Sequence, residues 1–372
     1  MSLTVENNIL MKNGKPFFYL ADTCWSAFTN ITDNDWDYYL DYRKSQGFNT
    51  LQINILPQWD ASATDLCYEP FEVVDGKYNY KKLNLSYFDH ADKMCARAKE
   101  KGFELALVVM WCNFVPDTWA SQFYSKGVMP IDCIENYINI VHETFTKYDP
   151  LYVISGDTDF NTDLCIEHYV KCAKQLKELA PHCLYTTHIK GRYTYIPDDL
   201  YSYLDLCFYQ SGHNAQNLAM PYLLAEEMID KYKGKPVINS EPCYEDMGYS
   251  RQMYGRWSKE DIIRAAWMSL LSGAGAGITY GAAGIYSWHS TNKGFEASLG
   301  EGFATPKCWQ QALCFEGAWD YGYMKYVFET YDLYGLKASQ ELLVKENPEI
   351  RVAKKDNKII MYVPHNIDIE LN

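Results

Sequence analysis

Eight short apolar runs, each followed by a segment with helical periodicity, constrain the fold of this chain more than any other feature. The runs have the length of strands buried on both faces and cover residues 17–22, 50–56, 104–111, 151–156, 183–188, 205–210, 236–241 and 277–282. The helical segments cover residues 34–46, 86–101, 132–147, 162–179, 197–203, 217–232, 258–272 and 305–328. Strict alternation of this kind is typical of a closed parallel barrel, so we predict an α/β protein with a (β/α)₈ (TIM) barrel.

Both ends of the chain carry hairpin patterns outside these units. At the N-terminus, residues 5–20 flank Asn13-Gly14, a dipeptide that favours the left-handed turn of a hairpin. Near the C-terminus, residues 349–353 and 358–363 predict a second hairpin. We expect this hairpin to pair with the N-terminal one or to pack on the barrel.

The chain length favours one barrel over two equal domains. TIM barrels run from roughly 200 to over 400 residues, and the chain has 372. No Gly-rich phosphate loop follows the first run, which argues against a dinucleotide-binding fold. We expect a barrel domain over residues 1–335, N-terminal hairpin included, and a β-hairpin appendage over residues 336–372, a candidate remnant of a larger β-domain.

Charge and composition exclude several classes of partner. The net charge is −14 without a basic run, so we expect no nucleic-acid partner. No apolar stretch of membrane-spanning length occurs, and the first residues lack a secretory pattern, so we expect a cytoplasmic protein unless a signal was removed. The 12 cysteines are scattered and lack zinc spacing, which predicts free thiols and neither metal nor other cofactor. The oligomeric state stays open.

Candidate site residues are those that end the apolar runs, because barrel enzymes place catalytic groups at the C-terminal ends of their strands. These residues are Asp22, Trp25, Asn54, Gln58, Trp111, Asn113, Asp157, Asp159, His188, Gln210, His213, Glu241 and Tyr280. The chain is also 16% aromatic, and aromatic rings stack on sugars as well as filling cores. One end of the barrel therefore combines acids, amides, imidazoles and rings.

Two of these acids form a candidate catalytic pair. Asp157 ends the fourth run and Glu241 the seventh, and strands four and seven face each other across a barrel. Pro242 favours extended backbone at Glu241. Two carboxyl groups that flank one bond are what acetal hydrolysis requires. Nearby loops hold three rival acids, Asp159, Glu245 and Asp246.

Several motifs resemble the apiosidase-like barrel glycosidases, a group similar to glycoside hydrolase family 140. They occur in the family's order and are FFYLADTCW (17–25), GFNTLQ (47–52), YFDH (87–90), ISGD (154–157), QSGH (210–213), SEPCYED (240–246) and AGAGITYG (274–281). The resemblance implies a clan A-type TIM barrel, a retaining mechanism, Asp157 as acid/base and Glu241 as nucleophile. Ser155 stands where the family usually has Gly, and only a hairpin follows where members usually carry a C-terminal β-domain.

We expect the substrate-binding residues to be Asp22, Trp25, Asn54, Trp111, His188, Gln210, His213, Tyr244 and Tyr280. Three basic residues, Lys190, Arg192 and Arg251, lie in loops on the same expected face, where they meet either solvent or an acidic sugar such as a uronate. The leading hypothesis is a retaining glycoside hydrolase for plant cell-wall-type oligosaccharides. Two alternatives stay open: an inactive carbohydrate-binding barrel, and a metal-dependent hydrolase using His188 and His213.

Overall fold

The computed structural model describes residues 2–57, 59–295 and 304–372 and contains one eight-stranded sheet in which every ladder is parallel. The order is β10-β9-β8-β5-β4-β13-β12-β11. The strands are β4 (Tyr19–Thr23), β5 (Thr50–Asn54), β8 (Glu104–Trp111), β9 (Leu151–Gly156), β10 (Leu184–Thr186), β11 (Cys207–Tyr209), β12 (Val237–Asn239) and β13 (Gly277–Tyr280). Each lies within one residue of a predicted run or inside it, so the barrel prediction is confirmed.

The sheet closes where its two outer strands meet. No ladder joins β10 to β11 in the described residues, but the Asp205 backbone N–H donates to the Tyr185 carbonyl at 2.8 Å. In return, Tyr185 N–H donates to the Asp205 carboxylate at 2.9 Å. These two bonds form a short seam that completes a nearly closed barrel.

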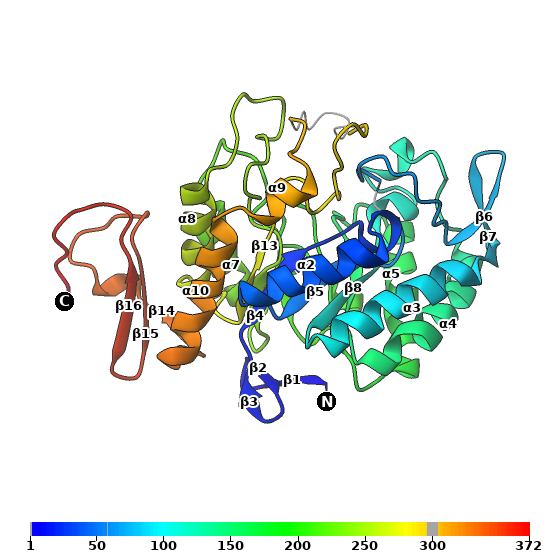
Figure 1. Cartoon of the computed structure of the whole chain (residues 1–372). Coiled ribbons are helices and arrows are strands. Elements are labelled where there is room, and N and C mark those ends of the chain that lie inside the picture. The colour runs from blue at the N-terminus through cyan, green and yellow to red at the C-terminus, as the bar shows by residue number, and fades with distance from the viewer. Residues whose placement is uncertain (1, 58, 296–303) are drawn as a thin grey trace.

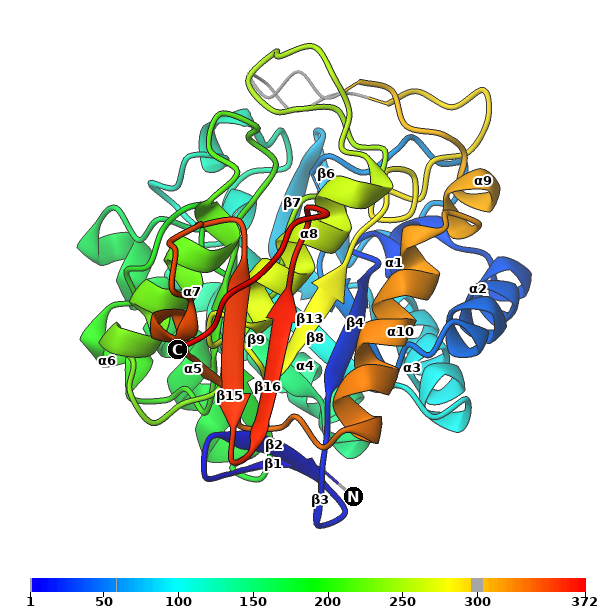
Figure 2. The same cartoon turned by 90° about the vertical axis from the view of Figure 1, so that its left-hand side faces the viewer.

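Helices surround the sheet (Figures 1 and 2). They are α1 (Ala27–Asn30), α2 (Asp33–Ser45), α3 (Leu85–Glu100), α4 (Ile134–Phe145), α5 (Asp163–Leu179), α6 (Asp198–Tyr201), α7 (Met220–Lys231), α8 (Lys259–Leu270), α9 (Trp309–Leu313) and α10 (Gly317–Thr330). The single helix predicted over 305–328 is wrong, because the chain forms α9 and α10 instead. The break lets the Gly317 N–H at the start of α10 donate to buried Glu245 at 3.3 Å.

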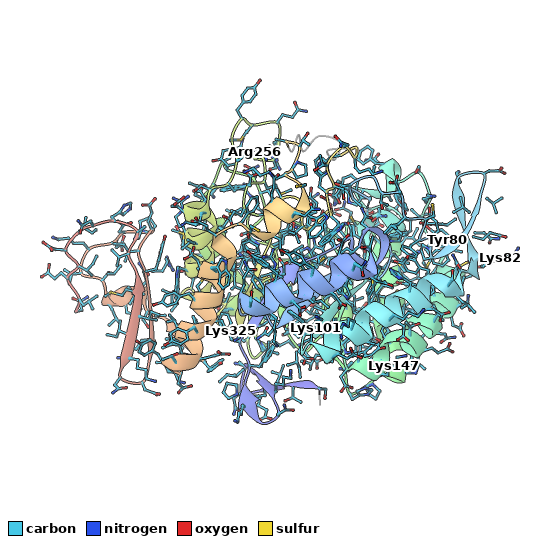
Figure 3. The ribbon with its side chains drawn as sticks, in the orientation of Figure 1. Tyr80, Lys82, Lys101, Lys147, Arg256 and Lys325 are labelled. Carbon is cyan, nitrogen blue, oxygen red and sulfur yellow. The ribbon has the colours of Figure 1, made fainter. Side chains whose placement is uncertain are left out.

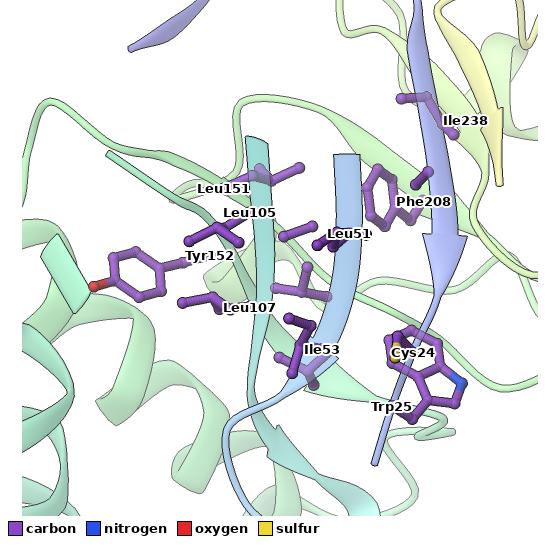
Figure 4. Packing of buried hydrophobic residues seen from close by; sticks show 14 of the residues in the cluster. Cys24, Trp25, Leu51, Ile53, Leu105, Leu107, Leu151, Tyr152, Phe208 and Ile238 are labelled. Atoms are coloured by element: carbon purple, nitrogen blue, oxygen red, sulfur yellow. The ribbon is translucent and has the colours of Figure 1, made fainter. Parts of the chain in front are cut away.

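Aliphatic side chains alternate along β5 and β8 and pack between neighbouring strands, as Figure 4 shows for Leu51, Ile53, Leu105 and Leu107. All of them are buried. All 12 cysteines are free thiols, as predicted, and nine of them are buried. None of the helices in the described part of the chain has the length and apolarity that crossing a membrane requires.

In the described part of the chain, three small antiparallel sheets lie outside the barrel. At the N-terminus, β1 (Leu3–Glu6), β2 (Ile9–Lys12) and β3 (Lys15–Pro16) lie below the barrel in Figure 1. The turn at Asn13 and Gly14 is left-handed, with φ of 55° and 72°, as predicted. A third strand exists because Asn7 and Asn8 make a second left-handed turn. A further hairpin, β6 (Phe71–Val74) and β7 (Lys77–Leu83), follows β5.

The C-terminal sheet contains β14 (Lys337–Ala338), β15 (Arg351–Lys355) and β16 (Lys358–Tyr362). The predicted hairpin is confirmed. Of its two expected placements, the observed one is packing on the barrel, beside α8 and α10 in Figure 1. Its ladders join it to β14, and none joins it to the N-terminal strands.

Candidate active site

A pocket of about 390 Å³ opens at the C-terminal ends of the barrel strands. Its lining residues come from the segments that follow all eight strands of the barrel. They are Trp25, Trp59, Asp60, Trp111, Trp119, Asp157, Lys190, Gly191, Arg192, Gln210, Gly212, His213, Asn214, Glu241, Tyr244, Met247, Ser250, Arg251 and Tyr286. Both acids of the predicted pair, Asp157 and Glu241, line the pocket.

Glu241 follows β12 and is held by two imidazoles. His188 Nε2 lies 2.8 Å from Glu241 Oε2, and His213 Nε2 lies 2.8 Å from Oε1. Because a carboxylate only accepts hydrogen bonds, both Nε2 atoms must carry hydrogen and donate. Each oxygen of the carboxylate therefore has its own donor, which fixes the side chain over the pocket.

The same contacts determine the protonation state of Glu241. Burial by itself raises the pKa of this carboxyl, because the charged form loses its hydration. The hydrogen bonds and charges of His188 and His213 outweigh burial and lower the pKa to about 2. Glu241 is therefore ionised at neutral pH and has no proton to give.

Aromatic rings surround this carboxylate. The Trp25 ring stacks on His188 with 5.6 Å between centroids, and the Trp111 ring lies 5.3 Å from the same imidazole. Trp25 Nε1 donates to the Tyr244 hydroxyl at 3.1 Å. Burial, followed by the charge of Glu241, raises the pKa of Tyr244 well above 10.0, so its hydroxyl keeps its proton. His188 bonds Glu241 but does not itself line the pocket, contrary to its expected contact with the substrate.

Asp157 follows β9 in a left-handed conformation with φ of 48°. The residue before it has to be glycine, because a Cβ at Gly156 would lie 2.1 Å from the Trp111 ring. Trp119 Nε1 donates to the Asp157 carbonyl at 2.8 Å. Trp111 thus packs against this turn and Trp119 holds its backbone at Asp157, which lines the pocket.

The expectation that Asp22 contacts a sugar is corrected by the structure. Asp22 is fully buried and does not line the pocket. Its Oδ2 accepts from Arg43 Nε at 2.6 Å and from the Tyr39 hydroxyl at 2.7 Å. Arg43, from α2, is fully buried as well, so Asp22 balances a charge inside the protein.

The expectation that Tyr280 and Asn54 bind the substrate is corrected in the same way, because both are buried and neither lines the pocket. The Tyr280 hydroxyl donates to Glu245 Oε2 at 2.7 Å. Asn113 is buried away from the pocket too, and Gln58 lies outside the described residues. The predicted residues that do line the pocket are Trp25, Trp111, Asp157, Gln210, His213, Glu241 and Tyr244, together with the three basic residues Lys190, Arg192 and Arg251.

The rival acids have other partners. Asp159 Oδ2 accepts from Lys190 Nζ at 2.8 Å. Glu245 bonds Tyr280 and Gly317, and Asp246 lies within 4 Å of two basic side chains, those of Arg256 and Lys307. None of the three acids lines the pocket.

Sequence reasoning missed several pocket residues, among them Trp59, Asp60, Trp119, Asn214 and Tyr286. They lie farther along the loops than the first polar residue after each strand. A search for aromatic residues through the whole of each loop would have found three of them. Asp60 matters most, because it is a third carboxylate on the pocket.

A larger cavity, of about 630 Å³, lies at the opposite end of the barrel. The N-terminal hairpin, the end of α7 and residues 334–338 line it, next to the starts of β4, β12 and β13. Barrel enzymes react at the C-terminal ends of their strands. The smaller pocket with the paired acids is therefore the candidate active site.

The described residues contain no group of three or more His, Cys, Asp or Glu side chains arranged to hold a metal ion. His188 and His213, the histidines of the metal-dependent alternative, both direct Nε2 at Glu241. An Nε2 atom that donates a hydrogen bond has no lone pair left for a metal.

Fold and site together define a glycoside hydrolase-like TIM barrel. The chain belongs to the apiosidase-like family, whose catalytic-domain model matches residues 5–334. A search of curated proteins finds no match.

Solved structures with the same fold include a family 5 glycoside hydrolase from Bacteroides vulgatus, at 24% identity and a TM-score of 0.81 over 97% of this chain and 80% of the other. A second glycoside hydrolase has 23% identity and a TM-score of 0.80, and the match covers 97% of this chain and 82% of the other. The endo-1,4-beta-mannanase from Rhizomucor miehei is more distant, with 13% identity and a TM-score of 0.58 over 89% and 100%. These likenesses concern the fold.

Proposed function

We propose that this protein is a retaining glycoside hydrolase for plant cell-wall-type oligosaccharides, with Glu241 as nucleophile and Asp157 as acid/base. The observation that carries the proposal is the double hydrogen bond from His188 and His213 to Glu241, in a pocket that Asp157 shares. An ionised carboxylate with both oxygens held in place suits attack on an anomeric carbon.

The two acids take different roles because their environments differ. Glu241, with a pKa of about 2, is the group that forms a bond to the anomeric carbon. As that bond forms, the bond to the leaving oxygen breaks and Asp157 gives its proton to this oxygen. Water then attacks the same carbon, Asp157 takes a proton from the water, and Glu241 is released. Retention requires the two carboxyl groups to lie about 5–5.5 Å apart.

The walls of the pocket suit a sugar ring. Trp59 and Trp119 meet edge to face, with centroids 5.3 Å apart, and Trp25 and Trp111 lie 5.2 Å apart around His188. Indole rings present broad apolar faces, which match the apolar faces of a sugar. The aromatic lining thus supports a carbohydrate substrate.

The test is hydrolysis of a panel of aryl glycosides and plant cell-wall oligosaccharides, with the anomeric configuration of the first product followed by NMR. We expect wild type to release a product of retained configuration and Glu241→Ala to release none. Asp157→Asn should lower kcat/KM by about 10²- to 10⁴-fold on substrates with poor leaving groups. Asp60→Asn is the matched control and should lose much less.

The alternatives predict different results from the same assay. A binding barrel hydrolyses nothing in the panel, and a metal-dependent enzyme loses activity to a chelator while Glu241→Ala protein retains some. If Asp60→Asn loses as much activity as Asp157→Asn, the acid/base assignment is wrong.

We also propose residues 1–335 as the catalytic unit and residues 336–372 as an appendage. Leu343, Ile350 and Val352 form a small apolar cluster separate from the barrel core, which supports this division.

A further inference from the structure

Two arginines on the pocket wall have no acidic partner. Arg192 and Arg251 both line the pocket, and within the described part of the chain no carboxylate pairs with either. A third cation on the wall, Lys190, differs because Asp159 neutralises it at 2.8 Å. Unlike Lys190, neither Arg192 nor Arg251 has a paired carboxylate among the described residues, although Asp60, Asp157 and Glu241 line the same pocket.

The fold holds both arginines next to the segment that carries His213. The Arg192 backbone N–H donates to the Gln210 carbonyl at 2.9 Å, and its Nη2 donates to the Asn214 carbonyl. Ser250 N–H, one residue before Arg251, donates to the His213 carbonyl at 3.1 Å. Since His213 also donates to Glu241, the segments that carry the two arginines are held next to the residue that bonds the proposed nucleophile.

The position of Arg192 is electrostatically unfavourable. Its Nε is buried without a hydrogen-bond partner. Burial, followed by the positive charge of Arg251, lowers the pKa of Arg192. Both residues also adopt left-handed backbone, with φ of 70° and 60°, which costs energy for a residue other than glycine. An anion between the two side chains would offset the charge repulsion.

We propose that Arg192 and Arg251 form a subsite for an anionic substituent of the substrate, a carboxylate or a sulfate ester. A guanidinium group presents parallel N–H donors that fit the paired oxygens of either group. This inference rests on the proposed function, which supplies the sugar ligand. It narrows the substrate class to sugars that carry an acidic group near the bond that is cleaved.

The test measures equilibrium binding, so it does not depend on turnover. The probes are methyl glucoside, methyl glucuronide and methyl glucoside 6-sulfate, titrated into wild type by calorimetry. We expect at least one anionic probe to bind about tenfold more tightly than the neutral one, with a preference that falls as salt rises. The preference of one anion over the other identifies carboxylate or sulfate as the natural group.

Variants locate the site. Arg251→Gln, at an exposed position, and Arg192→Gln should each reduce the preference for the anion, and the double variant should bind all three probes alike. Arg97→Gln is the charge-matched control, because Arg97 lies on α3, pairs with Asp37 and Glu100 and does not line the pocket. Lys101, at the C-terminal end of the same helix, lies well away from Arg256 in Figure 3. This control should retain the wild-type preference.

Three outcomes overturn the proposal: equal binding of neutral and anionic probes, an anion preference that survives in the double variant, or no binding of any probe by wild type. Binding of an anionic probe by a protein that hydrolyses nothing would leave the subsite standing and overturn only the proposed function. Hydrolysis of neutral and acidic substrates at equal kcat/KM would support the proposed function and overturn the subsite.

Discussion

At the scale of single residues, the chemistry of the pocket depends on how one buried carboxylate is solvated. Glu241 has exchanged water for two imidazole donors, and its pKa is about 2 instead of 4.5. Because this pKa is lowered, the ionised side chain stabilises the folded state above about pH 4.5, and the contribution is lost as the pH falls toward 2. The nucleophile we propose is thus also part of the stability of the fold at mildly acidic pH.

Removing one imidazole should move the acid limb of the pH profile. In His213→Ala, Glu241 Oε1 loses its donor, so the pKa rises toward 4.5 and kcat/KM falls at a higher pH than in wild type. The measurement is kcat/KM from about pH 3 to about pH 8. His142→Ala, on α4, serves as control and should leave the limb in place. An unchanged limb in both His213→Ala and His188→Ala would show that the imidazoles do not control Glu241.

At the scale of elements, the barrel is weakest where β10 meets β11. Both strands are three residues long, and two hydrogen bonds between Tyr185 and Asp205 join them in place of a ladder. Lys177 Nζ, from α5, also donates to the Asp205 carboxylate at 3.1 Å. One side chain therefore connects two strands and a helix.

Truncating this side chain should destabilise the barrel. Asp205→Ala leaves the Tyr185 N–H without an acceptor, and we expect a loss of about 1–3 kcal/mol in the free energy of unfolding, measured by urea titration. Asp205→Asn keeps an acceptor oxygen and should lose less. Asp230→Ala, at an exposed ion pair, should change stability by no more than about 0.5 kcal/mol. Equal stability of Asp205→Ala and wild type would mean that the seam is held elsewhere.

At the scale of the whole molecule, the C-terminal sheet is attached to the barrel by apolar packing of Ala353, Ile360 and Tyr362 and by polar contacts near its two ends. Arg351 of β15 is buried, pairs with Glu226, and lies over the Tyr222 ring at 4.3 Å. Both partners belong to α7. Near the other end of the sheet, Lys355 reaches Asp332 at 2.9 Å.

Arg351→Ala should loosen the C-terminal sheet while the barrel stays intact. Losing the ion pair and the cation–π contact should cost about 1 kcal/mol locally. Backbone hydrogen exchange should accelerate in β15 and β16 and remain unchanged in β8 and β9. Lys358→Ala, at an exposed side chain of β16, is the control. Faster exchange throughout the barrel would show that sheet and barrel unfold together.

Much of the architecture followed from local patterns in the sequence. Strands buried on both faces leave continuous apolar runs, so all eight barrel strands were predictable, and Asp157 and Glu241 were recognisable as acids at strand ends. The β6–β7 hairpin could not be predicted, because Glu72, Val73 and Val74 are exposed and no buried apolar run marks this segment. The break before α10 was missed because Glu245, which accepts a hydrogen bond from Gly317 at the start of α10, lies 72 positions away in the sequence.

The sequence by itself determined the number and order of the eight barrel strands, most of the helices between them and the residues that end each strand, because these depend on neighbours within a few positions. Only the tertiary structure decided which of those residues face the pocket. Asp22 ends a strand as Asp157 does, yet Arg43 from α2 occupies its oxygen, whereas His188 and His213 from two other strand ends converge on Glu241. Such partners are brought together by closure of the barrel, and spacing along the chain does not record them.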